Sequence, residues 1–181
     1  DTTTSVLIDP LRPAISLPDD ALLPPEGVHL RWPDSALAKE ERLHRYKIDL
    51  ALTYAAANKL DRTVIEAPNA RLGIVTTGKS YLDVRQALAQ LGLDDAGTAE
   101  AGIRVYKVGM PWPLEPHGIK VFAKGLSELF VVEEKRGLIE PQIKDALYEL
   151  SDAERPRVIG KKDDAGNTLL PSWNELSPAM I

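Results

Sequence analysis

The sequence contains no cysteine, only three histidines and few aromatic residues, which make up 6% of its 181 positions. The absence of cysteine excludes disulfides, thiolate catalysis and cysteine-ligated metal or iron–sulfur centres within this chain. The histidines are His29, His44 and His117. They lack the close spacing of a metal-binding motif, so we expect structural or solvated roles for them. No apolar stretch is long enough to span a membrane, and the first residues do not resemble a signal peptide.

What the sequence does contain is the composition of an ordinary globular domain, with 44% hydrophobic and 27% charged residues. Its length is sufficient for one domain with a proper core. A net charge of −5 argues against nonspecific nucleic-acid binding. Together with the absence of cysteine, this composition fits a cytoplasmic location.

Prolines mark both ends of the chain. Five of them fall within residues 1–27, a spacing that prevents a helix and predicts an extended linker. Residues 163–181 include Pro171 and Pro178 and show no helical pattern, so we expect a second linker there. We therefore predict one domain over residues 28–162, and we expect the chain to be part of a larger polypeptide.

A long helix is predicted before the main alternating pattern begins. Residues 28–32 alternate between apolar and polar side chains and predict a short strand. Asp34 or Ser35 can then cap a helix that extends to about Leu60. Its apolar face recurs at helical spacing and comprises Leu43, Tyr46, Leu50, Tyr54 and Ala57.

From Leu72 onward, short apolar runs alternate with amphipathic helical patterns. These patterns predict strands at 72–75, 103–108, 128–132 and 158–160, helices that begin near 80, 116 and 139, and a polar loop over 94–102. Such alternation predicts a three-layer α/β fold with a mostly parallel, Rossmann-like sheet. Ser80 and Asp83 form a capping-box pair, so Ser80 is the expected N-cap of the first of these helices.

Three turns follow the carboxyl ends of predicted strands. They should meet at one edge of the sheet, where open parallel sheets bind their ligands. We therefore regard the residues of these turns as candidates for ligand binding or for contact with another domain. They are Thr76, Thr77, Gly78, Lys79, Ser80, Gly109, Met110, Glu133, Glu134, Lys135 and Arg136.

The first of these turns also matches the phosphate-loop pattern G-x-x-x-x-G-K-[ST], from Gly73 to Ser80. In a phosphate loop the first glycine follows its strand, whereas Gly73 precedes the apolar residues of the predicted strand. An ATP-binding domain is therefore the alternative hypothesis and not the preferred one. A milder possibility is that the helix amides and Lys79 hold a phosphate or a carboxylate. Otherwise Gly78 makes the turn, Ser80 caps the helix and Lys79 is solvated.

The third turn carries four consecutive charges. Glu133 and Glu134 could act as a paired acid and base. They could instead cap a helix, or pair with Lys135, Arg136 or a neighbouring domain. No Ser–His–Asp triad can be assembled from the sequence, so the residues by themselves do not define a reaction.

Three segments of the chain resemble the indolepyruvate ferredoxin oxidoreductases, a branch of the 2-oxoacid:ferredoxin oxidoreductase superfamily. They occur in the family's order, and the similarity extends over roughly residues 28–181. The segments are 72–84, 108–116 and 131–136, the last followed by Ile139 and Glu140. The resemblance identifies the region with the domain that is similar to the C-terminal domain of transketolase.

The resemblance implies a parent enzyme that oxidatively decarboxylates arylpyruvates to acyl-CoA. It would use thiamine diphosphate, Mg²⁺, iron–sulfur clusters and coenzyme A, and it would pass electrons to ferredoxin. The chain lacks cysteines for clusters, and it lacks the G-D-G and asparagine pattern that would hold Mg²⁺ and the diphosphate. The glutamate that activates thiamine belongs to a domain that would precede Asp1.

We therefore expect an accessory domain that has no catalytic residues and binds no cofactor itself. Its partners would be the thiamine-diphosphate-binding domains of an oligomeric parent. Residues 163–181 would lead toward one of these domains.

Overall fold

The computed structural model describes residues 9–11, 14–17 and 23–181. The chain divides into two compact units, Asp1–Asn58 and Lys59–Ile181, which we describe separately. The prediction of an extended segment over residues 1–27 falls partly outside the described residues, and the described part of it contains neither helix nor strand. In this division the unit that contains the sheet begins at Lys59, whereas the sequence predicts one domain over residues 28–162.

Unit 1 is built on one long helical run, as predicted. The run consists of α1 (Ala36–Arg42), a π-helical turn η1 (Leu43–Lys47) and α2 (Ile48–Ala57). Ser35 is the N-cap, and its hydroxyl accepts a hydrogen bond from the Ala38 amide at 3.1 Å. A side-chain oxygen in this position satisfies one of the backbone amides that a helix leaves without an internal partner.

The prediction of a strand at residues 28–32 is wrong, because these residues form turns and bends. The Arg31 guanidinium donates to the carboxylate of Glu26 and to its backbone carbonyl, both at 3.1 Å. These contacts close a compact loop, which an extended strand could not do. Alternation of apolar and polar residues predicts a strand reliably only where a second strand is available to form backbone hydrogen bonds with it.

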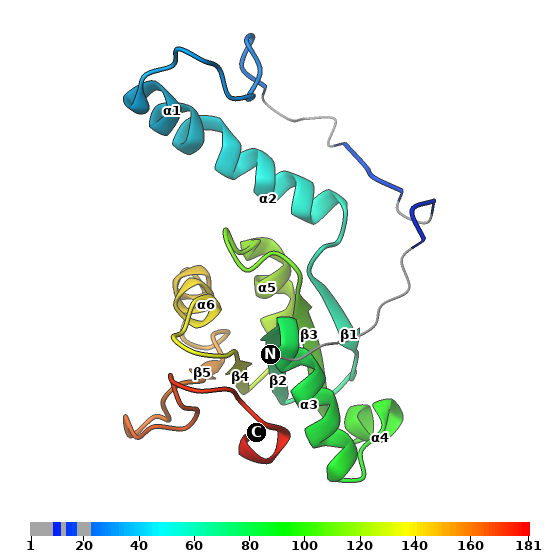
Figure 1. Ribbon diagram of the computed structural model, residues 1–181. Coiled ribbons are helices and arrows are strands. Elements are labelled where there is room, and N and C mark those ends of the chain that lie inside the picture. Colours follow the sequence, from blue (N-terminus) through cyan, green and yellow to red (C-terminus); the bar gives the residue numbers. More distant parts are fainter. Residues whose placement is uncertain (1–8, 12–13, 18–22) are drawn as a thin grey trace. The chain divides into compact units, whose positions relative to one another are not determined.

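Unit 2 is a five-stranded sheet with helices on it (Figure 1). Its strands lie in the order β1-β3-β2-β4-β5, and all neighbouring pairs are parallel except β1 with β3. The strands are β1 (Arg62–Ile65), β2 (Leu72–Thr77), β3 (Ile103–Val108), β4 (Glu128–Val132) and β5 (Arg157–Ile159). The helices are α3 (Gly78–Gln90), α4 (Asp95–Glu100), α5 (Pro116–Ala123), α6 (Ile139–Tyr148) and the short 3₁₀ turn η2 (Pro178–Met180).

The sheet lies between two apolar layers, so the predicted three-layer α/β architecture is confirmed. One face carries α5 and α6, whose buried residues pack with Val75, Val131 and other strand residues. The other face carries α3, and Val84 and Leu88 pack there with Ile74. Adjacent residues of β2 thus face opposite layers, as the alternation of a strand requires.

Gly73 shows why β2 needs a residue without a side chain. A Cβ atom at this position would lie 2.4 Å from Leu126 Cδ1 and 2.8 Å from Phe122 Cε1. The backbone of β2 therefore approaches the end of α5 more closely than any other residue would allow. Gly73 is a packing residue inside a strand, where it pairs with Arg104 on β3 and Leu129 on β4.

Two elements of unit 2 were not predicted. Residues 94–102 were expected to form a loop but contain α4, which Asp94 caps by accepting the Gly97 amide at 2.7 Å. The edge strand β1 was missed because it is short, only Ile65 in it is buried, and its register with β3 shifts between Thr63 and Ile65. Short elements of this kind carry too few residues for a periodic signal.

Part of the segment expected to be a linker, residues 163–181, packs against the sheet from Leu170 onward. Leu170 and Leu176 are each 1% exposed and belong to the apolar cluster on the α3 face. We call residues 169–181 the tail. The described helices include none that is long and apolar enough to cross a membrane.

Candidate functional site

The strand order defines one place where a ligand would be expected. The first parallel strand, β2, has β3 on one side and β4 on the other. The chain leaves β2 toward α3 on one face and leaves β4 toward α6 on the opposite face. The two connections diverge above the carboxyl ends of β2 and β4, which is the switch point where such sheets bind ligands. We call this place the switch-point crevice.

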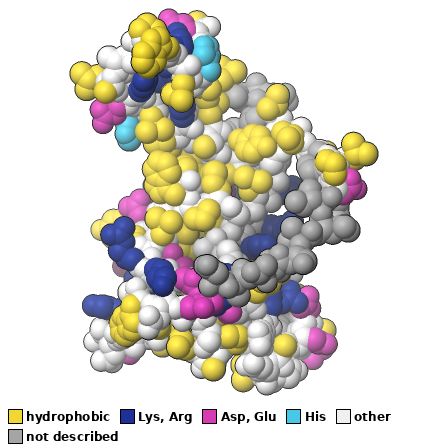
Figure 2. Space-filling model, viewed as in Figure 1, with side chains coloured by type: hydrophobic (Ala, Val, Ile, Leu, Met, Phe, Trp, Pro, Cys, Tyr) yellow, Lys and Arg dark blue, Asp and Glu magenta, His cyan; other side chains and the backbone are white. Residues whose placement is uncertain are grey.

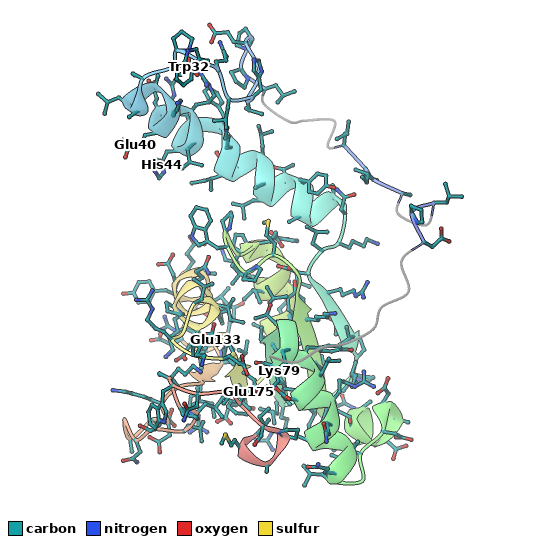
Figure 3. All side chains as sticks on the ribbon, viewed as in Figure 1. Trp32, Glu40, His44, Lys79, Glu133 and Glu175 are labelled. Atoms are coloured by element: carbon teal, nitrogen blue, oxygen red, sulfur yellow. The ribbon has the colours of Figure 1, made fainter. Side chains whose placement is uncertain are left out.

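The tail occupies the switch-point crevice (Figure 3). Lys79, at the start of α3, donates to the backbone carbonyl of Leu176 at 2.5 Å. The same ammonium group lies 2.9 Å from the Glu175 carboxylate, 3.0 Å from Asp83 and 3.4 Å from Glu134. Lys79 is therefore engaged with tail, helix and turn, and the interpretation of Lys79 as a solvated side chain is wrong.

The charge state of this cluster follows from its contacts. Burial by itself lowers the pKa of Lys79, but hydrogen bonds to Glu175 and Asp83 outweigh it, and the pKa lies above its ordinary value. The hydrogen bond from Lys79 lowers the pKa of Glu175 below 4.5. Lysine and glutamate are therefore both ionised near neutral pH, and neither is poised to exchange protons with a substrate.

Glu133 and Glu134 have separate structural roles. The Glu133 carboxylate is 3% exposed and accepts three amides at the start of α6, those of Leu138, Ile139 and Glu140, at 2.8–3.0 Å. This arrangement is a helix cap, in line with one of the two interpretations of the third turn. Glu134 accepts the Leu176 amide at 3.1 Å and so binds the tail. No feature of this geometry pairs the two carboxylates as acid and base.

Lys161, just after β5, is a second lysine that binds the tail, and the sequence reasoning missed it. Its ammonium donates to the Pro171 carbonyl at 3.2 Å and to the backbone carbonyl of Glu133. Burial lowers its pKa, against the influence of Glu133 and Glu140. It follows the carboxyl end of β5, which is parallel to β4, so the rule that placed the other three turns at this edge would have placed Lys161 there as well.

The remaining residues of the first turn differ from expectation in one respect. The helix begins at Gly78 with Thr77 as N-cap, so Ser80 lies within α3 and is not its cap. The Thr77 hydroxyl donates to the Val108 carbonyl at 3.0 Å and so ties β2 to β3. Gly78 has a φ of 54°, which few other residues adopt, and this confirms its assignment as the turn residue. Thr76 and Ser80 are buried, 0% and 2% exposed.

Lys135 and Arg136 lie on the exposed side of the third turn. Lys135 has a φ of 56°, in the left-handed region. Among the described residues, neither side chain forms a hydrogen bond or an ion pair. Neither residue therefore makes a direct polar contact in the switch-point crevice, although the charge of Lys135 adds to the effect of Lys79 in lowering the pKa of Glu175.

The Gly109–Met110 turn binds an internal carboxylate. Asp61 Oδ1 accepts the Gly109 amide at 2.7 Å and the Met110 amide at 3.0 Å. Burial raises the pKa of Asp61, and the two amide hydrogen bonds oppose that rise. Asp61 Oδ2 is buried and has no hydrogen-bond partner among the described residues. The sequence separates Asp61 from its turn by 48 positions, so only the structure reveals the pair.

The phosphate-loop match does not form a phosphate loop. Gly73 lies inside β2, and five of the eight matched residues belong to that strand. The lysine that would reach a phosphate is bound to three carboxylates and a carbonyl. The prediction that Gly73 lies within its strand, and that the match is therefore not a phosphate loop, is confirmed.

In the described part of the chain, no group of three His, Asp or Glu side chains could hold a metal ion.

Comparison with known proteins gives a consistent family relationship. A family model described as the indolepyruvate oxidoreductase domain matches residues 62–181. The indolepyruvate oxidoreductase subunit IorA of Pyrococcus abyssi is 39% identical over 82 residues, and that of Thermococcus kodakarensis is 35% identical over 82. These alignments cover 44% and 45% of this chain but 11% of each relative, so the chain spans about a tenth of the length of the curated relatives it matches.

Two solved structures share part of the chain path. One is a 2-oxoglutarate:ferredoxin oxidoreductase from Magnetococcus marinus, at 19% identity and a TM-score of 0.47, covering 71% of this chain and 21% of that one. The other is a split-gene transketolase, at 17% identity and a TM-score of 0.42, covering 59% of this chain and 34% of that one. The α/β assignment itself rests on the strand order and layers described above.

Proposed function

Because the chain belongs to the indolepyruvate oxidoreductase domain family, we propose that it is an accessory, non-catalytic domain of a 2-oxoacid oxidoreductase. The parent would oxidatively decarboxylate arylpyruvates to acyl-CoA in the cytoplasm and reduce ferredoxin. Thiamine diphosphate, Mg²⁺, iron–sulfur clusters and coenzyme A would be bound by other parts of that enzyme. The chain has no cysteine to ligate a cluster.

One observation carries the non-catalytic assignment: the place where this sheet would bind a ligand is filled by the chain itself. Leu176 is 1% exposed there, and Lys79, Glu133 and Glu134 are all committed to internal contacts. A thiamine or nucleotide group would have to displace the tail to enter. The charged side chains of the crevice thus stabilise the fold, and the residues that catalyse the reaction lie in other domains of the parent enzyme.

The role that remains is to brace neighbouring domains. Unit 2 exposes several large apolar side chains, and Figure 2 shows hydrophobic side chains interrupting the charged surface on the side in view. Among them, Trp112 is 56% exposed and Tyr148 78% exposed. Exposed aromatic residues are enriched where proteins meet. We propose that such residues contact the thiamine-diphosphate-binding domains of an oligomeric parent.

The experiment is made in the whole parent enzyme, because an isolated domain can be inactive for trivial reasons. Glu134→Gln and Lys79→Ala are introduced, and kcat and KM for indolepyruvate are measured per folded enzyme. We expect kcat/KM within about threefold of wild type, since loss of a general acid or base costs about 100-fold or more. Arg136→Ala is the matched control, with a charge removed from the same edge.

A drop in kcat of the size expected for a lost acid or base, in enzyme that keeps its melting temperature, would overturn the proposal. A second readout uses the isolated chain with indolepyruvate, thiamine diphosphate, Mg²⁺, coenzyme A and an artificial electron acceptor. The expected result is no turnover. Measurable turnover by this chain alone would also contradict a non-catalytic role.

A further inference from the structure

We propose that the switch-point crevice is a peptide-binding groove, and that residues 169–181 are its reversible occupant, a latch rather than a fixed part of the core. The tail enters the groove through a series of bends, with Asn174 at a φ of 59°, and its last residues include the 3₁₀ turn η2. Its contacts with the groove have the character of peptide recognition: the groove binds its backbone groups, one carboxylate and two leucines. This inference does not depend on the proposed function.

The groove binds the tail backbone through side chains. Glu134 accepts the Leu176 amide, and Lys79 donates to the carbonyl of the same residue. Lys161 donates to the Pro171 carbonyl. Three side chains thus satisfy backbone groups of a segment that has no strand partner, in the way that a recognition groove does.

Two side-chain subsites add specificity. Leu170 and Leu176 pack into the apolar cluster that includes Ile74, Val84 and Val132. Glu175 lies against Lys79, and Figure 3 shows the two labelled side chains near one another at the start of α3. The sequence that this groove fits therefore combines leucines with an acidic residue directly before one of them.

The charges of the groove favour a peptide over a small anion. Lys79 is surrounded by Asp83 and Glu134 from the groove itself, in addition to Glu175 from the tail. Without the tail, Lys79 would face two negative charges, and Lys161 lies near Glu133, Glu134 and Glu140, so negative charges outnumber positive ones among these groups. A phosphate would meet net repulsion there, whereas a peptide offers an amide for Glu134 and a carbonyl for Lys79.

The tail is attached in a way that permits release. Across the described residues, no backbone–backbone hydrogen bond joins residues 170–181 to the sheet, although Leu169 donates to the Lys161 carbonyl. The parallel strands, by contrast, are held by continuous ladders.

The first test uses hydrogen exchange on the full chain. We expect the Leu176 amide to exchange through a local opening, well before the amides of Val75 and Val105. In Lys79→Ala, exchange at Leu176 should be roughly tenfold faster or more, as for a lost hydrogen bond to a charged group. Arg136→Ala, which removes a charge from the same edge but no tail contact, should leave it unchanged.

The second test supplies the tail as a separate peptide. A full chain carrying Leu176→Asp, whose own tail cannot seat, should bind a synthetic peptide of residues 168–181 saturably. The wild-type chain should bind that peptide at least roughly tenfold more weakly, because its own tail competes at high effective concentration. A peptide that itself carries Leu176→Asp should not bind either chain.

Four results would overturn the proposal. The Leu176 amide could exchange only together with Val75 and Val105, which would make the tail part of the core. The Leu176→Asp chain could remain folded and fail to bind the peptide. Millimolar inorganic phosphate could release the tail, which would make the groove an anion site. Sedimentation could show a dimer that disappears with Leu176→Asp, which would mean that the tail is exchanged between copies. If Leu176→Asp fails to fold, Glu134→Gln takes its place.

Discussion

The helical run of unit 1 and helix α6 of unit 2 differ sharply in how much they bury. In the run from Ala36 to Ala57 only Ala55 is buried, whereas the 10 residues of α6 include four that are buried. The unit 1 run is supported by its Ser35 cap and by ion pairs such as Asp34–Arg42. Helix α6 is supported by tertiary packing. A good cap and local pairs can thus define a helix whose apolar face has no core to fill within its own unit.

The largest expected difference concerns apolar side chains. Ile143 on α6 is 0% exposed, so Ile143→Ala should lower the free energy of unfolding of unit 2 by about 2–5 kcal/mol. Leu50 on α2 is only partly buried, and Leu50→Ala should cost less than about 1 kcal/mol in unit 1. Hydrogen exchange of amides in each unit measures both values. Equal losses would show that the unit 1 helix is packed as tightly as α6.

The helix caps should differ less. Glu133 accepts three amides in a buried setting, whereas Ser35 accepts one at an exposed helix start. We expect Glu133→Ala to cost about 2–3 kcal/mol, because it leaves buried amides unpaired. Ser35→Ala should cost about 1 kcal/mol or less. Chemical denaturation provides the first value, and helix content by circular dichroism provides the second.

Glu133→Gln is the control that separates capping from chemistry. It keeps an acceptor oxygen but loses the charge and one acceptor site, so its cost should fall between those of wild type and Glu133→Ala. If Glu133→Gln were as damaging as Glu133→Ala, the negative charge at the start of α6 would matter more than the number of hydrogen bonds.

The smallest expected effect concerns stability as a function of pH, to which Asp34 and Asp61 should contribute in opposite directions. The hydrogen bond to Arg42 lowers the pKa of Asp34, so its contribution to stability is present above pH 3.8 and is lost as the pH falls through the lowered pKa. Burial raises the pKa of Asp61, so its ionisation destabilises the fold as the pH rises past 3.8. At neutral pH, Asp34→Asn should destabilise unit 1, and Asp61→Asn should slightly stabilise unit 2.

Both differences from wild type should disappear in acid, when the aspartates are protonated. Stability is measured by urea denaturation at a series of pH values from acid to neutral. Asp61→Asn keeps the oxygen that accepts the Gly109 and Met110 amides, so it changes charge without removing that contact. A loss of stability at neutral pH in Asp61→Asn would show that the amide contacts need the full charge of the carboxylate.

Most of the α/β scaffold could be predicted because burial on both faces leaves a strong signal. The strands β2, β3 and β4 are short apolar runs between helical patterns, and the prediction for β3 has the observed bounds. The helix in unit 1 was found from its spacing and from a cap predicted at Asp34 or Ser35, of which the structure has Ser35. The missed β1 and α4 are short and partly exposed, so neither periodicity nor composition distinguishes them from a loop.

The candidate site was predicted only in its location. Strand placement identified the edge above β2 and β4, and it correctly argued against a phosphate loop at Gly73. The occupants of the edge were not predicted. Lys161 was overlooked although it follows the carboxyl end of the parallel strand β5, whereas the tail reaches the edge only by folding back. The contacts that decide the roles of Lys79 and Glu134 join residues 97 and 42 positions apart, and the contacts of Glu133 also depend on where α6 begins.

The sequence by itself determined the alternation of strands and helices, the family of unit 2 and the absence of cysteine chemistry. These properties depend on local periodicity, short motifs and composition, which the chain carries in any conformation. Only the tertiary structure decided that Glu133 is a cap, that Asp61 fills the Gly109–Met110 turn and that the tail fills the switch-point crevice. Each of these is a pairing of polar groups far apart in the chain. No pattern in either partner specifies the other, and burial makes the pairing necessary.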